Sequence, residues 1–329
     1  MNEKILMGGE KTRLVWTPEN CRAVGVPERI VTKAEILASP EQYRDTQYLF
    51  STWGMPAFTE EEIGRCLPSL RAVFYAAGSV HSFAEPFLRA GVAVFSARAA
   101  NAVPVAEYTV AQILLANKGF FGACRRLYGG AAWQQTREYT QGFPGNYGAT
   151  VGIIGCGMIG SMVAERLRAY RLRVIVYDAF LSDGQIRALG AERVSLEELF
   201  ATADVVTNHL ANVPATVGML TGAHFASMKP NAVFLNTGRG ATVRQQELEE
   251  VLERRGDLTA VLDVTDPEPP EPDALLRVLP NVFLTPHISG SQQTECARMG
   301  AYMAEEFRAF EEGKDTRYRV TQEMLDTMA

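Results

Sequence analysis

Short apolar runs alternate with segments of helical periodicity along most of the chain. In the first hundred residues, apolar runs at 48–50, 72–75 and 92–95 end at small or turn-forming residues, which is typical of buried strands. Between the first two runs, Thr59 is followed three positions later by Glu62, and this spacing predicts a capped helix start. Strands that alternate with helices predict a parallel sheet covered on both faces.

The pattern changes near residue 103. Residues 103–118 are mostly apolar and predict a buried helix with Pro104 in its first turn and a domain boundary at its beginning. Glycine-rich stretches at 129–130 and 142–146 predict loops. A strand, a glycine-rich turn and a helix follow from residue 150. Further strands are predicted at 174–177, 204–206, 232–235, 259–262 and 282–284. This rhythm is typical of a doubly wound α/β sheet.

Composition narrows the class of protein. A chain of 329 residues suits two domains, and its net charge of −6 with interspersed signs gives no electrostatic support for binding nucleic acid or anionic membranes. Residues 1–12 lack the apolar core of a signal peptide, and no apolar stretch is long enough to span a bilayer. The five cysteines are scattered and lack CxxC spacing, so we expect reduced thiols, no disulfide, no metal site and a cytoplasmic protein.

A glycine motif predicts a dinucleotide site. Gly155, Gly157 and Gly160 follow the strand at 151–154 and open a helix through Met158 and Ile159. The first glycine permits the tight turn, the second lets the backbone approach a pyrophosphate, and the third allows close packing of helix on strand. Unpaired N–H groups at the start of the helix would then face the phosphates.

An acidic residue at the end of the next strand refines this prediction. Asp178 lies 18 residues beyond Gly160, where a carboxylate accepts hydrogen bonds from ribose hydroxyls and repels a 2′-phosphate. NAD is therefore favoured over NADP. The alternative is an ordinary glycine turn, with Asp178 as an ordinary residue at the end of a strand.

Three segments after later strands carry candidate chemistry: NTGRG at 236–240, DVTDPEP at 263–269 and TPHISG at 285–290. Hydride transfer at an alcohol carbon requires a group that exchanges the hydroxyl proton, and histidine suits neutral pH. It also requires a cation for a substrate carboxylate and carbonyl, and a carboxylate that orients the imidazole. His287, Arg239 and Glu268 supply one of each. A structural histidine, a surface arginine and a solvated glutamate remain the alternatives.

These three segments, the glycine turn and NAVPVAE at 101–107 together resemble the D-isomer-specific 2-hydroxyacid dehydrogenases, in the same order, over about 76–291. The resemblance implies two doubly wound parallel-sheet domains. One is a Rossmann NAD-binding domain at 101–290. The other is a flavodoxin-like substrate domain made of 1–100 and 291–329, on which the last helix packs.

The resemblance also implies roles for single residues. Arg239 would bind and polarise a 2-keto acid, His287 would exchange the proton, and Glu268 would pair with His287. Further cofactor-binding residues would be Thr237, Asp263, His287 and Gly290. Further substrate-binding residues would be Ala77, Gly78, Ser79 and Asn101, the first three through backbone N–H groups.

Several departures from the family pattern bear on the substrate. Val80 stands where the family usually has Asp, and Ala211 stands where it usually has Pro. Trp53 stands about where the phosphoglycerate branch has a basic residue, which argues against a phosphorylated substrate. Glu268 argues against the formate dehydrogenase branch, which carries Gln there.

The resemblance leaves a second class of function open. Corepressors of the C-terminal-binding type share these residues and act as NAD-responsive dimeric scaffolds, whereas the leading hypothesis is an NAD-dependent oxidoreductase acting on D-2-hydroxy acids. The resemblance implies a homodimer in either case. His209 is expected to serve structure or packing of the cofactor loop. Trp133 and Tyr139 are expected in a loop region, as core or dimer contacts.

Overall fold

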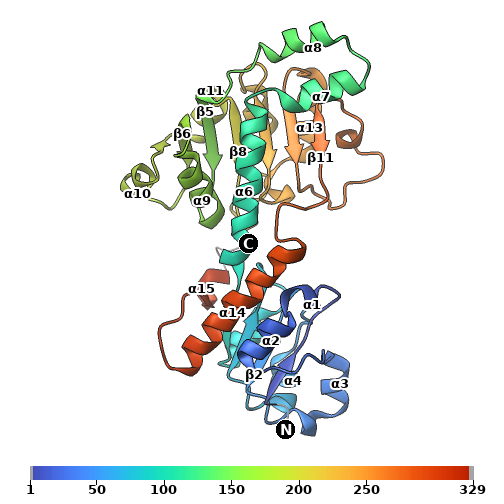
Figure 1. Cartoon of the computed structure of the whole chain (residues 1–329), viewed down its shortest axis with the longest axis vertical. Helices are drawn as coiled ribbons and strands as arrows, with labels where there is room; N and C mark the ends of the chain where they lie inside the picture. The colour runs from blue at the N-terminus through green and yellow to red at the C-terminus, as the bar shows by residue number, and fades with distance from the viewer. Residues whose placement is uncertain (1–2, 326–329) are drawn as a thin grey trace. The chain divides into compact units, whose positions relative to one another are not determined.

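The computed structural model describes residues 3–325 and divides them into two compact units (Figure 1). Unit 1 contains the described residues up to Ala102 and from Ser291 onward, and unit 2 contains Val103–Gly290. The predicted boundary at 100/101 lies two residues earlier, and the assignment of unit 1 to substrate binding stays a prediction. In the described part of the chain, no helix is long and apolar enough to cross a membrane.

Unit 1 contains a five-stranded sheet in the order β1-β2-β3-β4-β12. Its strands are β1 (Lys4–Leu6), β2 (Tyr48–Ser51), β3 (Ala72–Tyr75), β4 (Ala93–Ser96) and β12 (Arg319–Val320). The first four strands are parallel, and β2, β3 and β4 correspond to the predicted apolar runs, whereas β1 was not predicted. The short β12 pairs antiparallel with β4 and has no counterpart in the predicted strands.

Helices cover both faces of this sheet because successive strand side chains point to opposite sides. In β2, Tyr48 and Phe50 pack toward one hydrophobic cluster and Leu49 toward the other. The first face is covered by α1 (Thr12–Val15), α2 (Pro18–Val24) and α14 (Cys296–Glu311). The second is covered by α3 (Lys33–Ala38), α4 (Glu60–Cys66) and α5 (Ala84–Arg89). The short helices η1 (Pro40–Gln42), η4 (Gln293–Glu295) and α15 (Gln322–Leu325) complete the unit.

The predicted helix start at Thr59 is confirmed. The Thr59 hydroxyl accepts the N–H of Glu62 at 3.1 Å, and the Glu62 carboxylate accepts the N–H of Thr59 at 2.9 Å, which is a complete capping box. The segment from Ser291 onward returns to the first part of the chain, because α14 packs against α1 and α2.

Unit 2 contains a seven-stranded parallel sheet in the order β11-β10-β9-β8-β5-β6-β7. Its strands are β5 (Tyr147–Ile154), β6 (Arg171–Tyr177), β7 (Glu192–Arg193), β8 (Val205–Asn208), β9 (Val233–Asn236), β10 (Thr259–Leu262) and β11 (Val282–Leu284). The order reverses at β5 and β8, which is the doubly wound arrangement that the sequence predicts.

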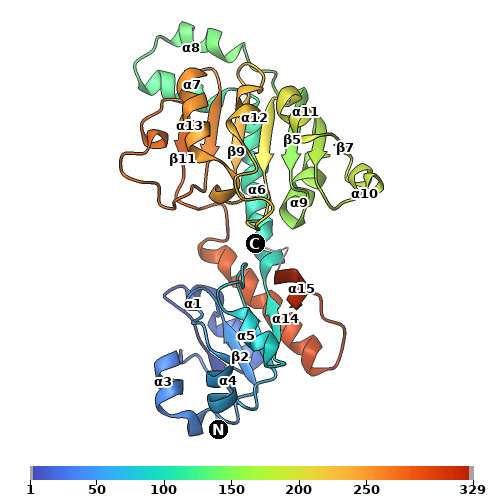
Figure 2. The same ribbon diagram turned by 180° about the vertical axis from the view of Figure 1, so that it is seen from behind.

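Two helical layers sandwich this sheet, and Figures 1 and 2 show them from opposite sides. One layer contains α6 (Arg98–Ala116), α9 (Met158–Leu167) and α10 (Asp183–Ala188). The other contains α11 (Leu196–Thr202), α12 (Gly222–Ala226) and α13 (Gln245–Arg254). In β6, Val174 and Val176 face the first layer and Ile175 faces the second. The turns η2 (Gly240–Thr242) and η3 (Leu275–Arg277) lie in loops.

Two predictions about helices are wrong. Helix α6 begins at Arg98 rather than at 103, so Pro104 lies inside it rather than in its first turn. Residues predicted as a loop region also form α7 (Phe120–Tyr128) and α8 (Trp133–Thr140), which places Trp133 and Tyr139 in a helix. No residue of α7 and only Thr136 of α8 is buried, although the apolar residues Phe120, Cys124 and Leu127 recur along α7 at helical spacing.

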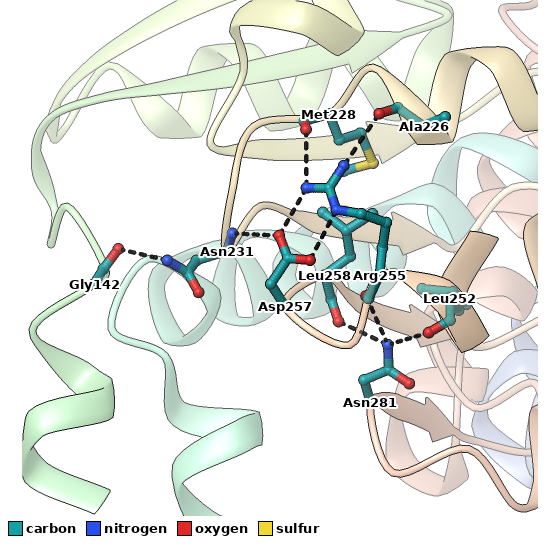
Figure 3. A network of polar contacts seen from close by, with 9 residues as sticks. All are labelled: Gly142, Ala226, Met228, Asn231, Leu252, Arg255, Asp257, Leu258 and Asn281. Atoms are coloured by element: carbon teal, nitrogen blue, oxygen red, sulfur yellow. Dashed lines mark hydrogen bonds and ion pairs between the residues drawn. The ribbon is translucent and has the colours of Figure 1, made fainter.

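A polar network holds the amino ends of three strands of unit 2 (Figure 3). Arg255 forms a two-pronged ion pair with Asp257, with N···O distances of 2.8 and 2.7 Å. The side-chain amide of Asn281 donates to the carbonyl groups of Leu252, Arg255 and Leu258. Asp257 also accepts the N–H of Asn231 at 3.4 Å, so the network fixes the segments that enter β9, β10 and β11. The opposite edge, where the parallel strands end, is left for ligands.

Candidate active site

Six strands of unit 2 end in one row. Ile154 pairs with Tyr177 and Asn208, and the row continues through Asn236 and Leu262. Leu284 of β11 completes the row by pairing with Leu262. The next residue of each strand therefore emerges at the same edge of the sheet. These residues are Gly155, Asp178, His209, Thr237, Asp263 and Thr285.

The three glycines of the predicted turn each meet a different requirement. Gly155 has a left-handed φ of 79°, which favours glycine, and a Cβ there would lie 3.1 Å from the backbone of His209. A Cβ on Gly160 would lie 2.1 Å from the carbonyl oxygen of Gly155. A Cβ on Gly157 would meet no atom within 4 Å, so the space before the first turn of α9, at Met158 and Ile159, is open. The turn therefore fits a pyrophosphate.

Asp178 is 7% exposed, and its carboxylate holds the glycine turn. One oxygen accepts the N–H of Cys156 at 2.7 Å, and the other accepts the N–H groups of Phe180 and Leu181, both at 2.8 Å. The sequence predicted only contacts to ribose hydroxyls. The structure adds that this carboxylate joins the end of β6 to the turn after β5.

His209 lies in a chain of hydroxyl groups. Its Nε2 is 3.1 Å from the Thr207 hydroxyl, and its Nδ1 is 3.4 Å from the Thr237 hydroxyl, which lies 3.0 Å from the Thr109 hydroxyl of α6. Burial lowers the pKa of His209 to about 3, so the imidazole is neutral at physiological pH. This placement agrees with the expected role in packing the cofactor loop beside Thr237.

Asp263 is 3% exposed and fixes the loop after β11. Its carboxylate accepts the Thr285 hydroxyl at 2.6 Å and the N–H groups of Ile288 and Ser289 at 2.8 and 2.9 Å. The hydroxyl of Thr285 was not among the predicted site groups, because its contact with Asp263 arises only when β11 lies beside β10. The loop ends at Gly290, the last residue of unit 2.

His287 and Glu268 form a pair at this edge. Nδ1 of His287 lies 2.7 Å from a carboxylate oxygen of Glu268, and the two side chains are 48% and 41% exposed. The His287 backbone has a φ of 52° and donates its N–H to the carbonyl of Asp263 at 3.0 Å. Left-handed backbone at a residue other than glycine is held by its surroundings and is frequent at functional sites. A cavity of about 400 Å³ lies beside the pair, between Pro269, Pro270, Arg277 and Leu284.

Arg239 lies next to the loop that carries Glu268. A Cβ on Gly240 would lie 2.0 Å from the Thr265 carbonyl oxygen, so only glycine allows these two loops to approach so closely. The Arg239 guanidinium donates to the Gly238 carbonyl at 2.8 Å. Burial lowers the pKa of Arg239 and the charge of Glu268 raises it, and a guanidinium stays cationic at neutral pH. The structure thus brings Arg239, Glu268 and His287 to one edge of unit 2.

The predicted substrate residues Ala77, Gly78, Ser79 and Asn101 lie in unit 1. The Ser96 hydroxyl donates to the carbonyl groups of Ala77 and Gly78 at 3.1 and 2.6 Å, which fixes the loop after β3. A Cβ on Gly78 would lie 3.7 Å from the side-chain amide of Asn101, so the structure places Asn101 beside this loop. Lys11 lies over the Trp53 ring, with 5.3 Å from its Nζ to the ring centroid.

Within residues 3–325, no cluster of three or more His, Cys, Asp and Glu side chains is placed to hold a metal ion. Four of the five cysteines are buried, and Cys124 is partly exposed.

Comparison with known proteins identifies the family. Residues 118–289 match the family model of the D-isomer specific 2-hydroxyacid dehydrogenase, NAD binding domain. The chain is 30% identical over 289 residues to a glyoxylate reductase of Korarchaeum cryptofilum, which covers 87% of this chain and 86% of that protein. It is 32% identical over 230 residues to a D-3-phosphoglycerate dehydrogenase of Archaeoglobus fulgidus. That match covers 70% of this chain but only 43% of that protein.

A solved structure shows the same fold. The apo form of D-mandelate dehydrogenase of Rhodotorula graminis superimposes with a TM-score of 0.83 at 22% identity, covering 98% of each chain. The predicted α/β fold class and the predicted NAD cofactor are confirmed. By its family match and its glyoxylate reductase relative, the chain belongs to the D-isomer specific 2-hydroxyacid dehydrogenase family.

Proposed function

We propose that this protein is an NAD-dependent D-2-hydroxyacid dehydrogenase that interconverts a D-2-hydroxy acid and a 2-keto acid. The observation that carries the proposal is the exposed pair of His287 and Glu268, 2.7 Å apart, next to the loop of the mostly buried cation Arg239. This set lies at the same sheet edge as a glycine turn that fits a pyrophosphate. A proton-exchanging group, a fixed cation and a dinucleotide site are the parts that such a reaction needs.

The residues then take distinct roles. Bound NAD(H) supplies or accepts the hydride. Arg239 binds the substrate carboxylate and stabilises the negative charge that develops on the carbonyl oxygen during reduction. His287 donates a proton to that oxygen through Nε2, because Nδ1 is occupied by Glu268. Glu268 orients the imidazole through its hydrogen bond with Nδ1. Asp263 positions His287 by holding the backbone of the following residues.

We assign cofactor binding to the glycine turn with Met158 and Ile159, to Asp178, and to the set of Thr237, Asp263, His287 and Gly290. The support is their common place at the ends of the strand row. For unit 1 we assign substrate binding to the loop Ala77, Gly78 and Ser79 and to Asn101. For unit 2 we assign it to Arg239. The support is the fixed geometry of that loop and its neighbour.

A panel of 2-keto acids tests the proposal. Purified protein is assayed for oxidation of NADH and, in parallel, of NADPH, with small, branched, aromatic, dicarboxylic and phosphorylated 2-keto acids. We expect turnover with NADH, a preference for NADH over NADPH, and the weakest activity on phosphorylated acids, since the indole of Trp53 cannot neutralise a phosphate. Tight NADH binding without turnover on any acid would instead support the alternative function, an NAD-responsive dimeric scaffold. The named relatives, a reductase and a dehydrogenase, do not favour it.

We further propose that the protein is a homodimer in the cytoplasm. Large apolar side chains on α7 and α8 are exposed, and a second copy of the chain would cover them. These residues are Phe120, Leu127, Tyr128 and Trp133. Sedimentation equilibrium at several concentrations tests the dimer. Free cysteines in the structure support a reducing compartment.

A further inference from the structure

One large apolar side chain is exposed close to the glycine turn at 155–160. Phe180 lies two residues after Asp178 and is 86% exposed, whereas phenylalanine is usually among the most buried residues. Its neighbour Leu181 packs against the hydrophobic cluster of the α6, α9 and α10 layer. The loop therefore packs Leu181 partly against this cluster and leaves the side chain of Phe180 in solvent.

This loop is held on two sides. The Asp178 carboxylate accepts the N–H groups of Phe180 and Leu181, both at 2.8 Å. From β7, Arg193 donates to the carbonyl of Asp178 at 2.6 Å and to that of Leu181, and it pairs with Asp183 at 2.5 Å. A backbone tied by so many hydrogen bonds presents the Phe180 side chain from a fixed position.

The same carboxylate locates Phe180 relative to the cofactor turn. One Asp178 oxygen binds the N–H of Cys156, the second residue of the glycine turn, and the other binds the N–H of Phe180. A dinucleotide whose pyrophosphate lies on the turn places its adenosine on the side of the second strand of the unit, here β6. Phe180 lies two residues after Asp178 and three after the end of β6, so its backbone lies on this side of the unit.

We propose that Phe180 forms the wall of the adenine subsite and that the adenine of NAD stacks on its ring. An exposed aromatic ring and a purine each offer a flat π face, and their contact removes apolar surface of both from water. Stacking does not depend on the hydrogen-bonding groups at the edge of the base, so the Phe180 ring accepts other purines in place of adenine. The proposal rests on the NAD cofactor and not on the proposed reaction.

Binding measurements test the proposal without any turnover. Dissociation constants for NADH and for ADP-ribose, which carries the adenosine but no nicotinamide, are measured by titration calorimetry on the wild type and on Phe180→Ala, Phe180→Leu and Phe180→Trp. We expect Ala and Leu to weaken both ligands by a similar factor of roughly ten, and Trp to bind both nearly as the wild type does. Thermal unfolding verifies that each variant is folded.

Tyr147→Ala is the matched control, because Tyr147 is also an aromatic side chain of unit 2, is 77% exposed, and lies at the opposite end of the sheet, where β5 begins. It should leave both dissociation constants unchanged. Wild-type binding by Phe180→Ala would overturn the proposal, as would equal weakening by Phe180→Trp or by Tyr147→Ala. Absence of turnover in the 2-keto acid panel, by contrast, would leave these binding results standing.

Discussion

The turn around Asp178 and the loops around His287 lie at the same edge of one sheet but are built in different ways. In the turn, the charged side chain is buried and its hydrogen bonds go to backbone N–H groups, while backbone N–H groups at the start of α9 face the open space. In the loops, the charged side chains of Glu268 and His287 are half-exposed and bind each other. The first region thus presents backbone to a ligand, and the second presents titratable side chains.

Asp263 shows that this difference does not follow from residue type. It lies in the second region, yet it is buried and accepts three hydrogen bonds, as Asp178 does. A buried carboxylate that accepts several hydrogen bonds stabilises a backbone conformation. An exposed one beside an imidazole remains available to orient it. Substitution of the buried carboxylate in the turn should therefore lower stability and NADH binding. Substitution of the charged side chains in the loops should instead lower the rate.

Arg239→Ala should give the largest effect. It removes the cation that we assign to the substrate carboxylate and carbonyl, so we expect kcat/KM to fall by at least roughly 10³-fold. The dissociation constant of NADH, measured by fluorescence titration, should change by less than about three-fold. Arg239→Lys keeps the charge without the planar fork and should recover only part of the rate. A loss of NADH affinity as large as the loss of rate would contradict the separation of the two regions.

His287→Gln should lower kcat by roughly 10²- to 10³-fold, because a general acid contributes about this much. Glu268→Gln, which keeps a hydrogen-bond acceptor but removes the charge, should lower it by about ten- to a hundred-fold. Both are measured at saturating NADH with the best acid of the panel. Thermal unfolding should shift little, since both side chains are half-exposed. A large loss of stability with unchanged kcat would assign this pair to structure.

Asp178→Asn should lower stability and NADH binding more than the rate, in contrast to the substitutions of Arg239, His287 and Glu268. The amide offers one acceptor oxygen where three N–H groups need partners, and its own N–H₂ group faces donors. We expect the free energy of unfolding to fall by about 2 kcal/mol and NADH to bind more weakly. Urea denaturation and calorimetry measure the two effects, with kcat at saturating NADH as the readout that should change least. A variant with wild-type stability and a reduced kcat would place Asp178 with the side chains that act on the rate.

The sequence predicted the strand row well because each strand is a short apolar run followed by a turn residue, which is a local signal. Spacing alone also indicated that Arg239, Glu268 and His287 lie at the ends of neighbouring strands. It could not indicate which partners the carboxylates take. Asp178 and Asp263 look like free ligands in the sequence, and only the folded loops bring backbone N–H groups to them.

Other features had no local signal. Strand β12 is two residues long and pairs with a strand more than two hundred residues away. Helix α8 is mostly polar and buries only Thr136, so its sequence lacks an apolar stripe. The hydroxyl contacts of Thr109 and Thr285 depend on the approach of α6 to β9 and of β11 to β10. Threonine is too common for its position alone to mark such contacts.

His209 lies between the two regions, because β8 separates the β5–β6 side of the sheet from β9 and β10. Burial lowers its pKa to about 3 from the ordinary value of 6.5. Between these pH values the unfolded chain binds a proton that the folded chain does not, so stability is full above pH 6.5 and falls as the pH drops toward 3.

His209→Asn should remove this part of the acid sensitivity. Because His209 is half-buried, we expect the variant to lose about 1 kcal/mol less than the wild type between pH 7.5 and pH 5. Urea denaturation at the two pH values measures this difference. Equal acid sensitivity of both proteins would show that the imidazole between the two regions is not held neutral by the fold.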